Sequence, residues 1–145
     1  MSATATRTEN YRSISTTEAA KLIRARLKTV FPEYKFKVRS SKYSGGSSID
    51  VQTTIKREDN RELWEKIQAE LEGFQGKDFD GMIDMSFYRR SWLNPDGSAV
   101  LADHSGTTGS AGVISPYSAP APDENSELVW FHSDHVHLSY DWSAK

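Results

Sequence analysis

Cysteine is absent from this 145-residue chain, and so are long apolar runs. Without cysteine there is no disulfide framework, no thiolate nucleophile and no cysteine-based zinc site. No apolar stretch approaches the ~20 residues that a helix needs to cross a bilayer. The N-terminal ten residues also lack the apolar middle of a signal peptide. We therefore expect a cytoplasmic protein with no membrane partner.

The composition is that of a soluble globular protein. Hydrophobic residues make up 37% of the chain and charged residues 26%, which differs from the composition of disordered chains. A chain of this length can bury a substantial core. We expect a disordered tail over residues 1–13 and a single domain over residues 14–142.

The net charge of −2 hides an uneven distribution along the chain. Residues 1–57 hold 12 Lys and Arg against 4 Asp and Glu, a net charge of +8. Residues 58–145 hold 6 Lys and Arg against 16 Asp and Glu, a net charge of −10. A chain divided in this way can present one basic and one acidic surface. The alternative is that the two halves pack together and their fields partly cancel.

The first half of the chain predicts a helix, a hairpin and a second helix. Ser15 and Glu18 have the spacing of a capping box, and apolar residues follow at helical intervals as far as Pro32. Alternation over residues 35–40 and 48–54 predicts two strands joined by a glycine-containing loop. For the second helix, Asp59 is predicted as the N-cap, with Glu62 at capping-box spacing.

The second half predicts further strands. A turn is expected at Phe79-Asp80-Gly81, and the segments 82–93 and 98–104 read as antiparallel strands around Asn94-Pro95-Asp96-Gly97. Residues 105–125 predict a long Gly, Ser and Pro loop. Residues 127–142 predict one bent strand or a tight hairpin. The predicted fold is α+β, with one antiparallel sheet, two helices on one of its faces and the element order α-β-β-α-β-β-β.

Cations alternate along the first predicted strand and form the leading functional candidate. Lys35, Lys37 and Arg39 face outward, and cations at this period can track a phosphate backbone while aromatic side chains stack on bases. The alternative is a solvated sheet face that discourages aggregation. The full candidate set for nucleic-acid binding is Lys35, Lys37, Arg39, Lys42, Tyr43, Arg89, Arg90 and Trp92.

Three histidines form the pattern His132-x-x-His135-x-His137. On a strand, His135 and His137 share one face, and two imidazoles at that spacing can share a divalent metal. The alternative, an exposed half-solvated strand, is favoured, so no metal or other cofactor is assigned.

No catalytic site is predicted. Asp80 and Asp96 precede glycines and are expected to form turns, whereas Asp84 is expected on the more exposed face of its strand. A carboxylate pair for hydrolysis lacks a recognisable partner. The loop Ser44-Gly-Gly-Ser47 could form an anion nest, but it joins two strands and lacks the Lys-Ser/Thr of a P-loop. We expect a protein that acts by binding, not an enzyme.

The chain resembles a known family, the large polyvalent protein associated domain 29. The resemblance is carried by ISTTEAAKLIRARLKTVFPEYKFKVRSSKYSGGSSIDV and FDGMIDMSFYRRSWLNPDG, and more weakly by GTTGSAG and ELVWFHSDHVHL. Such domains look like modules of large polyvalent proteins of phages and conjugative elements, and they also occur as small stand-alone proteins. Their larger relatives are thought to travel with incoming DNA and help it to become established. The resemblance implies no catalytic residues.

Two functions follow as expectations. The first is an accessory protein of a phage or mobile element that contacts nucleic acid through the basic sheet face. The second is a counter-defence inhibitor or adaptor, similar to an anti-CRISPR protein, that binds a host defence protein through the acidic half. A small hydrolase or a metal-dependent enzyme ranks third.

Overall fold

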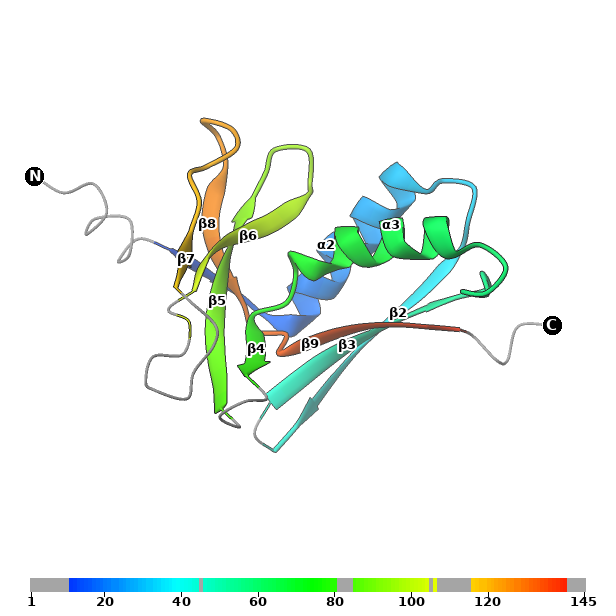
Figure 1. Cartoon of the computed structure of the whole chain (residues 1–145), viewed down its shortest axis with the longest axis horizontal. Coiled ribbons are helices and arrows are strands. Elements are labelled where there is room, and N and C mark those ends of the chain that lie inside the picture. The colour runs from blue at the N-terminus through cyan, green and yellow to red at the C-terminus, as the bar shows by residue number, and fades with distance from the viewer. Residues whose placement is uncertain (1–10, 45, 81–84, 105, 107–115, 141–145) are drawn as a thin grey trace, which may run out of the picture.

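The computed structural model describes residues 11–44, 46–80, 85–104, 106 and 116–140. These residues form an α+β fold (Figure 1). Of the helices in the described residues, none is both long and apolar enough to cross a membrane. In chain order the elements are β1 (Arg12–Ile14), α2 (Thr16–Val30), β2 (Phe36–Tyr43), β3 (Gly46–Thr53), α3 (Arg61–Glu72), β4 (Lys77–Asp80), β5 (Met85–Leu93), β6 (Ala99–His104), β7 (Tyr117–Ser118), β8 (Glu127–Phe131) and β9 (His135–Tyr140).

The strands form two sheets, so the α+β class is confirmed but the single antiparallel sheet is wrong. The small sheet has the order β2-β3-β9. The large sheet has the order β1-β8-β5-β6-β7, and β4 also pairs with β5. Two of the pairings are parallel, β1 with β8 and β3 with β9. Parallel partners lie far apart in sequence, and no turn between them signals the pairing.

Three segments differ from their prediction. Residues 12 and 13, expected in the tail, belong to β1, which pairs with β8. The turn expected at Phe79 lies within β4, which pairs with β5. Residues 127–142 form neither one bent strand nor a hairpin, because β8 and β9 join different sheets. Most of the predicted tail and much of the predicted loop lie outside the described residues, although β7 falls inside that loop segment.

The helix caps show how closely local signals determine the ends of these elements. The Ser15 side chain accepts a hydrogen bond from the Glu18 backbone N–H at 3.2 Å, so the predicted N-cap of α2 is confirmed. The N-cap of α3 is Asn60, which accepts from the Leu63 N–H at 3.2 Å, so the prediction of Asp59 is wrong by one residue. Asn is as good an N-cap as Asp, and sequence alone does not separate adjacent candidates.

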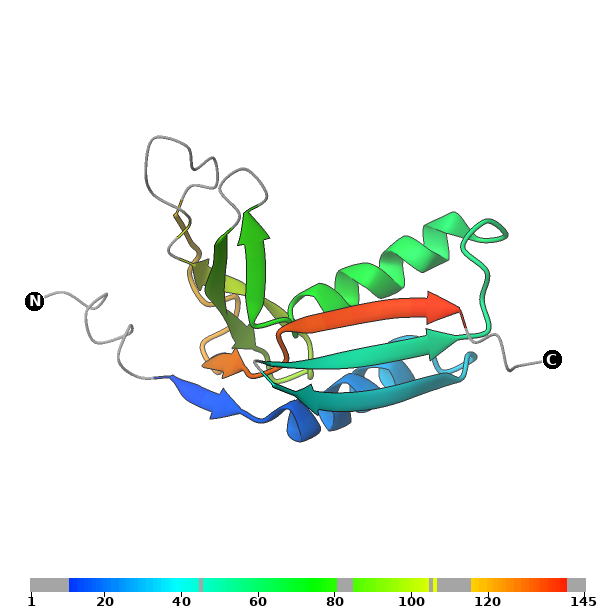
Figure 2. The ribbon, with the colours of Figure 1, turned by 90° about the horizontal axis from the view of Figure 1, so that it is seen from below.

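The main core lies between the two helices and one face of the small sheet. Ile23 and Leu27 of α2, Ile67 of α3, and Ile49 and Val51 of β3 are buried in one cluster. In Figure 2 the three strands of the small sheet lie in front of α2. Within the described ranges, no helix lies on the opposite face of this sheet.

The crossing from β8 to β9 connects the two sheets and is firmly anchored. Ser133 is buried, and its hydroxyl donates to the Phe74 carbonyl at 2.8 Å. The Gly76 N–H donates to the Ser133 carbonyl at 2.8 Å. A Cβ on Gly76 would lie 1.8 Å from the Phe131 carbonyl oxygen, so only glycine allows this approach. The anchored crossing directs β9 onto the edge of β3.

Candidate nucleic-acid interface

The small sheet has an outer face, the face turned away from α2 and α3. Pairing aligns its side chains in three rows across the strands, because directly paired residues share a face. On β2, exposed Lys37 and Arg39 alternate with buried Val38, which belongs to the core side. The rows of the outer face are Lys37–Gln52–Ser139, Arg39–Asp50–His137 and Ser41–Ser48–His135.

The predicted cations lie along one edge of the outer face. Lys35, Lys37 and Arg39 are all exposed. Alternate residues of a strand are about 7 Å apart, so the two β2 cations are regularly spaced. Lys35 and Arg39 belong to none of the ion pairs found among the described residues. Asp50 is the one acidic residue in the three rows, and it accepts from the Ser139 hydroxyl at 3.0 Å.

His135 and His137 share the outer face with these cations. Both are exposed, and their rings stack with centroids 5.7 Å apart and an interplanar angle of 26°. His137 occupies the same row as Arg39. Alternation along β9 predicted that the two histidines share a face. It gave no sign that β9 lies beside β3, and no local sequence signal could have done so.

His132 does not join the other two histidines. It lies between β8 and β9, where its ring contacts Trp130 with centroids 4.4 Å apart. Across the described ranges, no three His, Asp or Glu side chains are grouped so that they could hold a metal ion. The geometry therefore favours the His135–His137 pair as exposed rings over the pair as ligands.

Two further candidates, Lys42 and Tyr43, lie at the hairpin end of β2 and face opposite sides of the sheet. Tyr43 follows the alternation of the outer face and is 53% exposed. Lys42 is exposed but pairs with buried Ser47, so alternation places it on the opposite face from Arg39. Asp134 also lies here, and its carboxylate accepts from the Ser47 N–H at 3.4 Å. An anion nest at this loop is disfavoured, because a carboxylate of the chain itself already takes this N–H.

Arg89, Arg90 and Trp92 were predicted to extend the basic face if their strand joined the same sheet, but they lie on β5 in the large sheet. Arg89 is 4% exposed, donates to the Glu72 carbonyl at 3.2 Å and lies 3.6 Å from the Asp78 carboxylate. Burial lowers the pKa of the Arg89 guanidinium, and the negative charges of Glu72 and Asp78 partly offset that effect. These three residues therefore do not continue the row of Arg39.

The other two residues of this group are also engaged within the fold. Arg90 pairs with Asp103 through a hydrogen bond of 2.8 Å. Trp92 is 5% exposed, and its indole N–H donates to the Ala119 carbonyl at 3.0 Å. The sequence could not separate them from the basic face, because only the pairing of β5 decides which sheet holds them.

Comparison with known protein families assigns the chain to a family. The model of the large polyvalent protein associated domain 29 matches residues 14–116, more than two thirds of the chain. The chain belongs to this family. The same comparisons found no match among curated proteins and none among solved structures. The matched residues of this polyvalent-protein-associated domain include β2 and β3, whereas β8 and β9 lie beyond them.

Several carboxylates of the acidic half are paired within the fold. Glu70 binds Arg26 at 2.7 Å, and Glu127 binds Arg12 at 2.7 Å. The Arg12 hydrogen bond lowers the pKa of Glu127. With the pairs of Asp78 and Asp103, four arginines neutralise carboxylates of this half. Arg12 and Arg26 come from the basic half, so their two pairs reduce the acidic excess, whereas Arg89 and Arg90 are already counted in the net charge of the acidic half.

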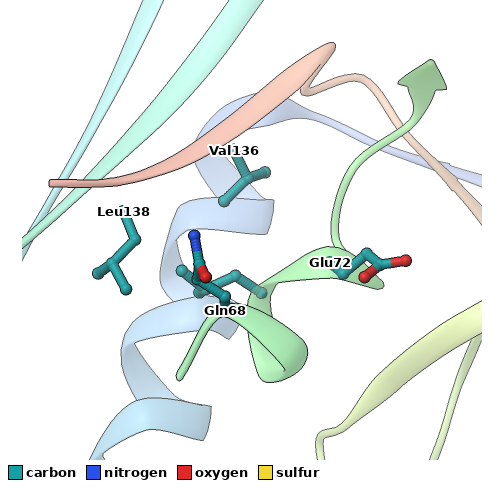
Figure 3. Close-up of a pocket in the computed structure, with 5 residues that line it drawn as sticks. Gln68, Glu72, Val136 and Leu138 are labelled. Atoms are coloured by element: carbon teal, nitrogen blue, oxygen red, sulfur yellow. The ribbon is translucent and has the colours of Figure 1, made fainter. Parts of the chain in front are cut away.

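A pocket of about 320 Å³ lies between α3 and β9 on the helix side of the small sheet (Figure 3). It is lined by Gln68, Leu71, Glu72, Val136 and Leu138. Val136 and Leu138 alternate with the two outer-face histidines, so the pocket opens on the other side of β9. The charged residue in its lining is Glu72, which would repel phosphate. This pocket does not add to the basic surface.

Of the carboxylates considered for catalysis, Asp96 is the one whose side chain the structure describes. Asp96 accepts from the Ser98 N–H at 2.9 Å and from the Ser98 hydroxyl at 2.6 Å, and these bonds lower its pKa. It therefore supports the turn before β6, as expected. Asp80 is the last residue of β4, and Asp84 lies outside the described residues.

Proposed function

We propose that this protein acts by binding, and that it contacts nucleic acid through the outer face of the small sheet. The observation that carries the proposal is the exposed row of Lys35, just before β2, with Lys37 and Arg39 on a sheet face that no helix of the described residues covers. Cations at a regular spacing on an open sheet suit the regular negative charge of a phosphate backbone. The membership in a polyvalent-protein-associated family fits a role as an accessory protein for incoming DNA.

The charge pattern favours this function over binding of a basic host protein. The outer face, with Lys35, presents three cations and Asp50 within the described residues. In contrast, several carboxylates of the acidic half are taken up by arginines of the same chain. Charges gathered on one exposed face steer association with a partner of opposite charge. An inhibitor that binds through the acidic half is thus an outcome to be tested, not the function proposed.

Three phosphate contacts give weak and salt-dependent binding. On a single strand each contact contributes about −0.7 to the slope of log K against log salt concentration, so a slope of about −2 is expected. The affinity is therefore expected in the micromolar range or weaker at physiological salt. Binding of this strength suits a module that acts beside other domains or at high local concentration.

The test is fluorescence anisotropy with labelled oligonucleotides at about 50 mM and about 200 mM salt. A basic-row variant changes Lys35, Lys37 and Arg39 together to Glu. A helix-control variant changes Lys21, Lys28 and Lys66 to Glu, which alters the net charge equally at exposed positions on α2 and α3. We expect the basic-row variant to lose binding and the helix control to retain most of it. Equal losses in both variants, or no wild-type binding at low salt, would refute the proposal.

A further inference from the structure

Three rings lie on the outer face beside the cations: Tyr43, His135 and His137. Tyr43 is 53% exposed, and the two histidines are also exposed. The histidine rings stack on one another with centroids 5.7 Å apart. Tyr43 lies on β2 with the cations, whereas the two histidines lie about 100 residues later in the chain. The antiparallel pairing of β2 with β3 and the parallel pairing of β3 with β9 bring the histidines to the same face.

The rings and the cations occupy adjoining parts of one surface. Along β2 the cations come first and Tyr43 comes last. Across the sheet, His137 shares the row of Arg39, and His135 shares the next row with Ser41. The distance from β2 to β9 is two strand spacings, about 10 Å. A nucleic-acid strand lying along β2 would hold its phosphates at the cations and extend its bases toward β9.

We infer that the outer face binds single-stranded nucleic acid, with bases stacked on His135 and His137 and phosphates at the basic row. This inference rests on the proposed function and specifies its substrate. In a duplex the faces of the bases are covered by their neighbours, so exposed protein rings have no base to stack upon. In a single strand those faces are open, and stacking on protein rings is the usual source of affinity that does not depend on sequence.

The alternatives for the same rings are weaker. A metal site would need a third ligand, and His132 contacts Trp130 instead. A structural role is disfavoured, because both histidines are exposed and lie outside the buried core clusters. Asp50, which pairs with His137 across the strands, accepts a hydrogen bond from the Ser139 hydroxyl. Stacking uses the two features that are present, an exposed ring pair and adjoining cations.

The experiment compares three probes of equal length by fluorescence anisotropy at low salt. They are a single strand, a duplex of the same sequence and an abasic single strand that keeps the phosphates but lacks the bases. DNA and RNA versions of the single strand are both measured, because the proposed contacts use chemistry that both share. We expect the single strand to bind at least about tenfold more tightly than the abasic strand, since base stacking on a ring supplies about this factor for each base.

The variants separate stacking from charge. His135→Ala with His137→Ala is expected to weaken single-strand binding at least about tenfold and to leave abasic-strand binding unchanged. His135→Phe with His137→Phe keeps flat rings without any charge, and it should preserve the single-strand affinity. His132→Ala is the matched control, because it removes an exposed histidine that lies off the outer face.

The outcomes distinguish this inference from the function on which it rests. If no probe binds at low salt, the proposed function fails and the inference fails with it. If the duplex binds as tightly as the single strand, or if the double alanine variant binds like the wild type, the function survives and the stacking inference is overturned. A phenylalanine variant as weak as the alanine variant would also overturn stacking.

Discussion

The two sheets of this protein hold arginine in opposite environments, one exposed and one buried. On the small sheet, Arg39 is exposed on a face that neither α2 nor α3 covers. On the large sheet, Arg89 is buried against the C-terminal end of α3 and near the Asp78 carboxylate. Both residues lie within strands, Arg39 in β2 and Arg89 in β5. The difference teaches that the elements packed against a strand decide whether its arginine is buried or exposed.

Stability and binding are expected to depend on different parts of this protein. Substitutions in the large sheet and at the crossing between the sheets should change stability. Substitutions on the outer face should change binding and leave stability nearly unchanged, because exposed positions away from specific contacts usually alter the free energy of unfolding by less than about 0.5 kcal/mol.

The largest effect is expected where the sheets meet. Gly76→Ala would place a Cβ 1.8 Å from the Phe131 carbonyl oxygen, and backbone atoms would have to move. Overpacking of this kind costs about 3 kcal/mol. The matched control is Gly97→Ala, where a φ of +89° is strained but nothing lies within 4 Å, so a cost of about 1 kcal/mol is expected. Urea unfolding of both variants measures the difference, and equal costs would contradict this view of the crossing.

A smaller effect is expected from the buried arginine. Arg89→Met removes the donor to the Glu72 carbonyl and the partner of Asp78, and it should cost about 2 kcal/mol of unfolding free energy. Arg39→Met on the outer face should change stability by less than about 0.5 kcal/mol. Both values come from urea unfolding under the same conditions. A stable Arg89→Met protein would mean that burial of this guanidinium is not required by the fold.

The smallest effect concerns pH. Burial and the nearby Arg89 charge lower the pKa of His104 below its ordinary value of 6.5. The unfolded chain then binds more protons than the folded chain, so stability falls as pH drops through about 6.5 toward the lower folded-state pKa. His104→Gln should flatten that part of the stability curve. Unfolding measured from pH 7.5 down to about pH 5 tests this, and an unchanged slope in the variant would rule His104 out as its source.

Local features of the sequence predicted much of the fold. The N-cap at Ser15 was correct because its hydrogen bond reaches only to Glu18. The turn before β6 was correct because Gly97, with a φ of +89°, and Asp96 are turn residues in their own right. The outward alternation of Lys37 and Arg39 was correct for the same reason, since it depends only on strand geometry.

Non-local pairing limited the rest. Nothing near β9 in sequence indicates that it pairs in parallel with β3, so the single sheet was wrong and the approach of His137 to the row of Arg39 could not be predicted. The same limit explains why Arg89 and Trp92 could be assigned to the basic face only on the condition that their strand joins the same sheet. Residue 12 was assigned to the tail because its partner strand, β8, begins more than a hundred residues later.

The central claim is that the outer face of the small sheet, and not the large sheet, contacts nucleic acid. The most direct test is a titration of the isotopically labelled protein with a short single-stranded oligonucleotide, followed through its assigned backbone amide resonances. We expect the largest shifts in the rows of Lys37, Arg39 and Ser41, including their partners on β9. Shifts centred on β5 and β6, or on the pocket beside α3, would contradict the account.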